Sequence, residues 1–140
     1  MNVIIMGCGR VGARVATLLD SGGHKVTIID RMATAFERLP KEFGGNTNIG
    51  TGIDEDVLRS AGIESTDVFV CTTNADNRNL MGAQVAQKVF GVPQVIVRLY
   101  DPVRADTYRE MGLHTICPTT TISALILDQI LDDSDSQVGM

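Results

Sequence analysis

The sequence predicts an α/β fold: a doubly wound parallel sheet of six strands with helices on both faces. Short apolar runs rich in β-branched residues alternate with longer segments of helical pattern along the whole chain. Strands separated by helices pair in parallel through right-handed crossovers. The runs do not alternate in polarity, as expected of strands buried on both faces. With 44% hydrophobic and 21% charged residues, the 140-residue chain has the composition of a single globular domain.

Each predicted strand is followed by a helical segment, and glycine or proline marks most boundaries between them. The predicted strands are 3–6, 26–29, 48–49, 68–71, 95–97 and 115–117. The predicted helices are 11–21, 33–42, 55–61, 77–90, 103–111 and 121–131. We therefore expect one folded domain over residues 1–131 and an acidic, flexible tail over residues 132–140.

Composition and charge argue against several classes of protein. No apolar run approaches the roughly 20 residues of a membrane-spanning helix, so we expect a soluble, cytoplasmic chain. The chain has a net charge of −5 and lacks the excess of basic residues that is typical of a duplex-binding domain, so we expect no nucleic-acid partner. The widely separated Cys8, Cys71 and Cys117 have no zinc spacing, so we expect them to pack as small hydrophobes in a reducing compartment.

The strongest motif is the glycine loop, Gly7-Cys8-Gly9-Arg10-Val11-Gly12, between the first strand and the first helix. In a Rossmann-like turn the first glycine makes the tight turn, the second lets a pyrophosphate approach, and the third lets helix and strand pack closely. The helix N-terminus then faces the phosphates. Arg10 is placed to contact a phosphate, including a terminal one; the alternative is an exposed arginine at a helix start.

An acidic residue at the end of the second strand extends this interpretation. Asp30 stands 18 residues after Gly12, where a carboxylate can accept hydrogen bonds from both ribose hydroxyls. The alternative is a surface aspartate beside a glycine turn. Arg31 could contact a 2′-phosphate, but Asp30 would repel that phosphate, so solvated surface is the better interpretation of Arg31. Adenine nucleotides and NAD(H) are therefore favoured over NADP(H).

Two further loops follow the third and fourth strands, at the sheet edge where ligands bind. Thr51, Gly52 and Ile53 belong to the first, and Thr73 and Asn74 to the second. The aspartates at the ends of these loops, Asp54 and Asp76, either cap the next helix or contact ligand. Arg98 ends the fifth strand and needs a partner, which is either a phosphate or a carboxylate such as Asp101.

Catalytic machinery is not evident in the sequence. His24 and His114 are not placed in a shared cleft, and there is no Ser-His-Asp order, Walker lysine or metal-ligand cluster. A nucleotide site without these groups favours sensing over turnover, so we expect no enzyme. Two alternatives remain: a fragment of an NAD-dependent oxidoreductase, and a structural assembly module with a vestigial pocket.

Several segments together resemble the RCK N-terminal (KTN, TrkA-N) domain of the Trk/Ktr-type proteins that regulate potassium uptake. The resemblance covers essentially the whole chain. It rests on the glycine loop, His24–Asp30, Asp54 followed by Leu58–Ile63, Thr73–Leu80, Val95–Arg98, Gly112 and Pro118.

This resemblance implies a regulatory subunit that binds an adenine nucleotide (ATP, ADP or AMP) or NAD(H). It also implies a cytoplasmic location at the inner face of the membrane, where the subunit controls a potassium channel or transporter by a ligand-dependent conformational change. The residues it implies at the nucleotide are Gly7, Gly9, Arg10, Gly12, Asp30, Thr73, Asn74 and Arg98.

The chain departs from the family pattern at three places. Gly50-Thr51 stands where many members have Gly-Asp, so the usual acidic contact to the base is in doubt. Arg98 and Tyr100 occupy a region that is acidic in calcium-gated relatives, so we expect no calcium site there. Because the chain ends near residue 140, the C-terminal RCK subdomain is expected to be missing.

The last predicted helix is apolar over much of its circumference, beyond the single stripe that a surface helix needs. This surplus predicts a homodimer or a larger ring formed through the C-terminal helix, which crosses to the neighbouring subunit in the family that the chain resembles. The residues concerned are Ile122, Leu125, Ile126, Leu127, Ile130 and Leu131.

Overall fold

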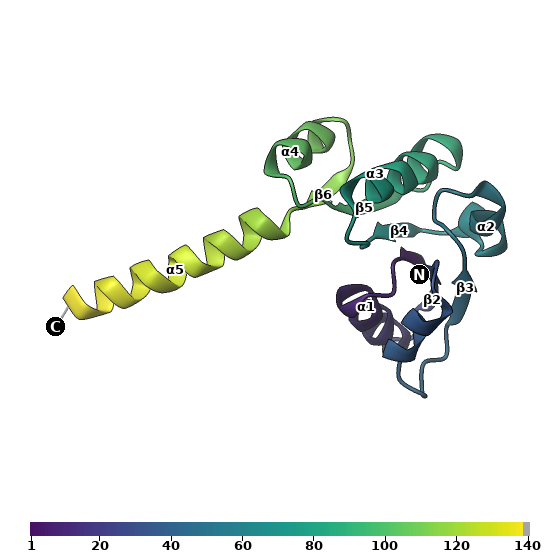
Figure 1. The fold of residues 1–140 in the computed structure, drawn as a ribbon, viewed down its shortest axis with the longest axis horizontal. Helices are drawn as coiled ribbons and strands as arrows, with labels where there is room; N and C mark the ends of the chain where they lie inside the picture. Colours follow the sequence, from purple (N-terminus) through teal and green to yellow (C-terminus); the bar gives the residue numbers. More distant parts are fainter. Residues whose placement is uncertain (139–140) are drawn as a thin grey trace.

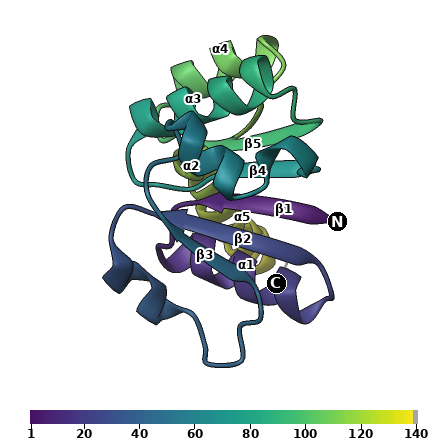
Figure 2. The ribbon, with the colours of Figure 1, turned by 90° about the vertical axis from the view of Figure 1, so that its right-hand side faces the viewer.

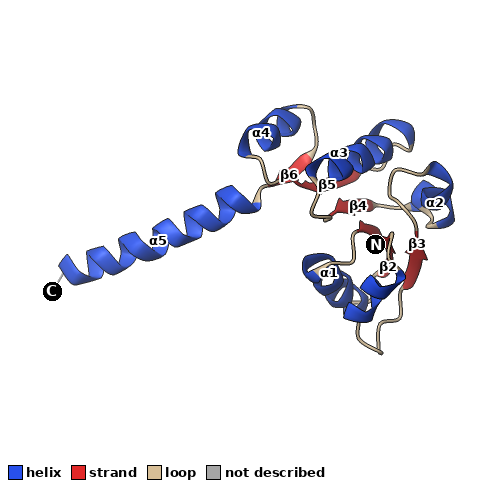
Figure 3. Cartoon of the chain, in the orientation of Figure 1, coloured by secondary structure: helices blue, strands red, loops and turns tan. Residues whose placement is uncertain are grey.

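The computed structural model describes the backbone of residues 1–138 and side chains as far as Asp132. It contains a six-stranded sheet in the order β3-β2-β1-β4-β5-β6, in which all five neighbouring pairs are parallel. The strands are β1 (Asn2–Met6), β2 (Lys25–Asp30), β3 (Asn46–Ile49), β4 (Val68–Cys71), β5 (Gln94–Arg98) and β6 (His114–Ile116). The predicted doubly wound parallel fold is confirmed (Figure 3).

Helices connect the strands in the expected alternation. The α-helices are α1 (Arg10–Ser21), α2 (Glu55–Ser60), α3 (Asp76–Gln84), α4 (Pro102–Glu110) and α5 (Pro118–Val138). Short 3₁₀ segments are η1 (Ala33–Arg38) and η2 (Ile63–Ser65), and a π-helical turn, η3 (Val85–Val89), continues α3. Within residues 1–138, no helix is both long enough and apolar enough to span a bilayer.

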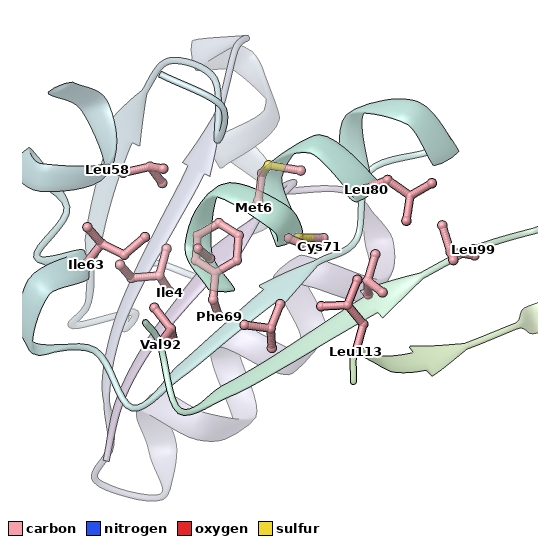
Figure 4. Close-up of a cluster of buried hydrophobic side chains, with 14 of the residues drawn as sticks. Ile4, Met6, Leu58, Ile63, Phe69, Cys71, Leu80, Val92, Leu99 and Leu113 are labelled. Atoms are coloured by element: carbon pink, nitrogen blue, oxygen red, sulfur yellow. The ribbon is translucent and has the colours of Figure 1, made fainter. Parts of the chain in front are cut away.

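Each face of the sheet has its own buried core, because successive side chains of a strand point to opposite faces. In β1, Val3 and Ile5 pack with α1 and η1, whereas Ile4 and Met6 pack with α2 and α3. Figure 2 shows α1 on the opposite side of the sheet from α2 and α3. The larger core surrounds Phe69 of β4 (Figure 4).

One predicted helix is wrong in type and length. Residues 33–42 were expected as a helix, but the structure has the 3₁₀ segment η1, which ends at Arg38. Leu39 is extended, with φ −80° and ψ 141°. The cause is Pro40, because a proline disfavours helical geometry in the residue before it and provides no backbone donor.

The last helix stands apart from the body of the domain. Helix α5 starts directly after β6 and projects away from the sheet (Figure 1). Its six predicted apolar side chains are exposed by 54–63%. The helix continues to Val138 instead of ending at residue 131, so the first part of the predicted tail is helical; residues 139 and 140 lie outside the described residues. The domain boundary at residue 131 stays a prediction.

Candidate functional site

A pocket of about 750 Å³ opens at the carboxyl ends of the strands. Its lining includes the loops after β1 and β4, neighbouring strands between which the strand order reverses, which is the usual ligand crevice of a doubly wound sheet. Thirteen of the fourteen candidate site residues taken from the sequence line this one pocket. They are Gly7, Cys8, Gly9, Arg10, Val11, Asp30, Arg31, Thr51, Gly52, Ile53, Thr73, Asn74 and Arg98.

Gly12, the fourteenth, has a packing role instead. A Cβ at this position would lie 1.9 Å from the carbonyl oxygen of Gly7 and 2.8 Å from Oγ1 of Thr72. Only glycine lets α1 approach β1 this closely, as the motif predicts for its third glycine. Gly12 is therefore separated from the pocket by the loop that it supports.

The front of the glycine loop is open. Gly7 makes the turn with φ +111°, and its N–H donates to Ile29 O at 2.8 Å. A Cβ at Gly9 would meet nothing within 4 Å, and no side chain caps α1 at this residue. Amides of the first turn of α1 are thus left for a ligand, and the positive end of the helix dipole favours an anion there.

Asp30 holds the back of the glycine loop. Its Oδ2 accepts a hydrogen bond from the Cys8 N–H at 2.9 Å, and its Oδ1 accepts one from the Met32 N–H at 2.9 Å. A carboxylate offers about four acceptor positions, so acceptor capacity remains for ribose hydroxyls. The aspartate therefore orients the loop and still faces the pocket that it lines.

Cys8 lies beneath the loop as a buried, neutral thiol. Burial raises its pKa to about 11, the Asp30 carboxylate adds to the rise, and the Arg38 guanidinium opposes it. The thiolate is the nucleophilic form of cysteine, so a neutral thiol is unreactive. Cys71 and Cys117 are also buried, which confirms that the cysteines pack as small hydrophobes. Burial likewise raises the pKa of the Cys71 thiol.

The opposite side of the pocket is held by Arg98. Its Nη2 donates to the carbonyl oxygens of Thr72 and Thr73, the latter at 2.9 Å, and its guanidinium lies 5.2 Å from the Tyr100 ring centroid. Its buried Nε has no protein partner. Of the two kinds of partner considered for Arg98, the structure does not give it the Asp101 carboxylate: Asp101 caps α4 by accepting from the Val103 N–H at 3.0 Å.

The other two aspartates resolve into different roles. Asp54 caps α2 by accepting from the Asp56 and Val57 amides. Asp76 does not cap α3; it accepts from the backbone N–H groups of Tyr100 and Asp101, at 2.9 and 3.2 Å. Helices α2 and α4 therefore have aspartate caps, whereas α1 and α3, which flank the central crevice, have no side-chain cap.

The pocket is strongly basic although the chain is acidic. Five arginines line it, and the one carboxylate is Asp30; the arginines are Arg10, Arg31, Arg38, Arg78 and Arg98. Neither Arg38 nor Arg78 was predicted as a site residue. Arg38 lies on η1, in a segment expected to be an ordinary helix. Arg78 lies in α3, within the Thr73–Leu80 segment that resembles the TrkA-N family. Such an arrangement binds ligands with several negative charges.

Groups suited to catalysis or metal binding do not gather at this site. Neither histidine lines the pocket, and among the residues that the structure describes no three His, Cys, Asp or Glu side chains form a group able to hold a metal. The arrangement supplies backbone amides, arginines, a carboxylate and the small polar residues of two loops. Chemically, these groups bind phosphates and sugar hydroxyls.

Comparison with known families adds to this geometry. Residues 3–119 match the model of the TrkA-N domain. The chain belongs to the TrkA-N domain family. The resemblance read from the glycine loop, the Thr73–Leu80 segment and Arg98 is thereby confirmed.

The chain also matches parts of longer curated relatives. The Trk system potassium uptake protein TrkA of Streptomyces coelicolor is 43% identical over 94% of this chain and 59% of its own length. The TrkA homolog of Methanothermobacter thermautotrophicus is 34% identical over 90% of this chain and 58% of its own length. The chain thus spans somewhat less than three fifths of each of these relatives.

Solved structures share the fold at lower identity. The TrkA-N domain of the inner membrane protein ybaL from Escherichia coli has a TM-score of 0.81 at 18% identity, over 91% of this chain and 95% of that one. The Shewanella denitrificans Kef CTD in its AMP-bound form has a TM-score of 0.77 at 23% identity, over 94% and 80%. The GsuK channel bound to NAD has a TM-score of 0.76 at 23% identity, over 96% and 24%.

Proposed function

We propose that this TrkA-N domain binds an adenine nucleotide and regulates a membrane potassium channel or transporter from the cytoplasmic side. The observation that carries the proposal is the charge of the pocket: five arginines and one carboxylate surround an uncapped helix N-terminus in a chain of net charge −5. A nucleoside polyphosphate places its negative charges where these donors converge.

Different parts of the pocket meet different parts of the nucleotide. The phosphates lie against the open face of Gly9 and the first turn of α1, within reach of Arg10. The ribose hydroxyls donate to the free acceptor positions of Asp30. The base lies toward β3, against the loop of Thr51, Gly52 and Ile53, in which Thr51 offers a hydroxyl in place of a carboxylate.

The names of the relatives support the wider role. The relatives at 43% and 34% identity are potassium uptake proteins, and structures of this fold include an AMP-bound and an NAD-bound form. We therefore infer a binding domain without catalysis, which reaches the membrane through its channel or transporter partner. Ligand binding changes the conformation of the domain, and the partner responds.

Isothermal calorimetry with ATP, ADP, AMP, NADH and NADPH tests the proposal directly. We expect binding of the adenine nucleotides and NADH, and no tighter binding of NADPH, because Asp30 repels a 2′-phosphate. Asp30→Ala should weaken ATP, ADP and NADH alike, since they share the adenosine ribose. If none of the five ligands binds, the proposed function is wrong; if NADPH binds more tightly than NADH, the role given to Asp30 is wrong.

Self-association through α5 is a second part of the proposal. Six apolar side chains on this helix are more than half exposed, which is a larger exposed surface than a monomeric domain usually tolerates. A second copy of the chain, pairing as a homodimer or within a ring, would cover them. Light scattering should find a dimer or larger species, and Leu125→Glu with Ile126→Glu should yield monomers. A wild-type monomer at about 100 μM would contradict this assembly.

A further inference from the structure

We propose that Asn79, which does not line the pocket, is a positioning residue. It enables the pocket wall formed by the loop after β4 and the end of β5 to hold a phosphate. Asn79 lies in α3 and is completely buried, which is costly for an amide unless its polar atoms are hydrogen-bonded. The inference rests on the proposed function and deepens it. It assigns the selection of phosphorylated ligands to a residue behind the pocket wall.

The amide of Asn79 joins two segments that are distant in sequence. Its Oδ1 accepts from the Thr73 backbone N–H at 3.0 Å and from the Thr73 hydroxyl at 2.6 Å. Its Nδ2 donates to Thr73 O and to Arg98 O, both at 2.9 Å. One side chain thus ties the loop after β4 to the end of β5, and both segments line the pocket.

These bonds control the charge that the loop presents. Carbonyl oxygens at the carboxyl end of a strand carry partial negative charge and would repel a phosphate. At this site the Thr73 carbonyl accepts from both Asn79 and Arg98, and Arg98 also engages the Thr72 carbonyl. Asn79 in turn binds the backbone of Arg98 and so fixes the start of that arginine's side chain. The phosphate therefore meets a guanidinium and compensated carbonyls.

The Thr73 hydroxyl takes part in this support. It lies within hydrogen-bonding distance of Asn79 Oδ1 and of the Ala75 backbone. The partners of this hydroxyl are therefore protein groups in the loop and in α3. Thr73 was predicted as a ligand contact from its position after β4. Thr73 lines the pocket together with Asn74 and the arginines, and its polar groups also build the wall.

The decisive variant is Asn79→Asp, which keeps the shape and replaces the two amide donors with an acceptor. The matched control is Asn77→Asp, which adds the same charge two residues away at an exposed position. Calorimetry should compare ADP with adenosine, because adenosine retains the ribose and base contacts but has no phosphate. We expect Asn79→Asp to weaken ADP at least about tenfold and to change adenosine affinity by less than about twofold.

A second variant keeps the test valid if Asn79→Asp does not fold. Thr73→Val is isosteric and removes the hydroxyl that Asn79 accepts from, whereas Thr73→Ser retains a hydroxyl. We expect Thr73→Val to lower the ratio of ADP to adenosine affinity and Thr73→Ser to restore it. An unchanged ratio in the folded variants, or an equal loss in Asn77→Asp, would overturn the positioning role. If wild type binds neither ligand, the proposed function fails and this inference fails with it.

Discussion

The two loops that face each other across the central crevice are built by opposite means. The glycine loop after β1 is shaped by the absence of side chains: Gly7 turns, Gly9 stays open and Gly12 lets α1 approach. The loop after β4 is shaped by side chains, because Asn79 and Arg98 hold its backbone from behind. The glycine loop therefore presents backbone amides to the pocket, and the loop after β4 presents a guanidinium and a backbone held in place by side-chain hydrogen bonds.

This difference determines how each side should tolerate substitution. On the side built from glycines, an atom added at a packed position should lower the stability of the protein, whereas an atom added in open space should leave the stability unchanged. On the side built from hydrogen bonds, removal of a donor should lower the stability of the protein, since a buried carbonyl without its donor lowers the free energy of unfolding by about 1–3 kcal/mol. Substitutions on each side can therefore separate stability from ligand binding.

The largest effect is expected for Gly12→Ala. The new Cβ would lie 1.9 Å from the Gly7 carbonyl oxygen, which is a backbone atom that cannot move without reshaping the loop. We expect a loss of about 3 kcal/mol in the free energy of unfolding, the upper range for overpacking. Urea unfolding followed by circular dichroism measures it.

Gly9→Ala, in the same loop, is its control. This position has φ −83° and no neighbour within 4 Å of the new Cβ, so stability should stay within about 1 kcal/mol of wild type. ADP affinity should nevertheless fall at least about tenfold, because the methyl group occupies the approach of the phosphates. Equal stability of the two variants would contradict the assignment of separate roles to these glycines.

The next effect is expected on the opposite side, for Arg98→Met. This change keeps the apolar length of the side chain and removes the Nη2 bonds to the Thr72 and Thr73 carbonyls. We expect a loss of about 2 kcal/mol, together with weaker ADP binding. Arg14→Met at an exposed position of α1 should change stability by less than about 0.5 kcal/mol. A similar loss in both variants would show that the wall does not depend on Arg98.

Arg10→Ala should separate binding from stability within the glycine loop. Arg10 is exposed and stands at the start of α1, so the fold should be unaffected. The variant loses a charge-assisted contact to a terminal phosphate, so its affinity for ATP should fall about tenfold and its affinity for AMP should fall less. Calorimetry with both nucleotides measures the ratio, with Arg14→Ala as the control. An equal loss for ATP and AMP would assign Arg10 to general phosphate binding and leave discrimination to Arg98 or a neighbouring chain.

The smallest effect concerns Cys8 beneath the loop. Because its pKa is raised to about 11, the thiol stays protonated in the folded state over a pH range where the unfolded thiol ionises. The unfolded state then binds fewer protons, so stability should fall as pH rises from about 9 to 11. Cys8→Ala should show a shallower fall in urea unfolding over the same range. Identical pH dependence in both proteins would contradict the raised pKa.

Much of the site could be predicted because its residues follow strands directly. The carboxyl ends of parallel strands meet at one edge, so Asp30, Thr51, Asn74 and Arg98 were expected to converge, and they line one pocket. Arg38 could not be found in this way. It lies at the end of the 3₁₀ segment η1, within a stretch predicted as an ordinary helix, and it does not follow a strand. The partners of Arg98 and Asp76 were also beyond prediction, since they are backbone groups far away in the chain.

The sequence by itself determined the alternation of strands and helices, the parallel sheet, the glycine turn and the acidic residue at the end of β2. These features depend on local periodicity and on residue types at short, fixed spacing. Only the tertiary structure decided the roles of the polar side chains. It made Asp54 a helix cap, Asp76 an acceptor for the amides of residues 100 and 101, and Asn79 the tie between two loops. The physical reason is that a polar group takes whichever partner the fold brings within about 3 Å, and sequence spacing does not reveal that partner.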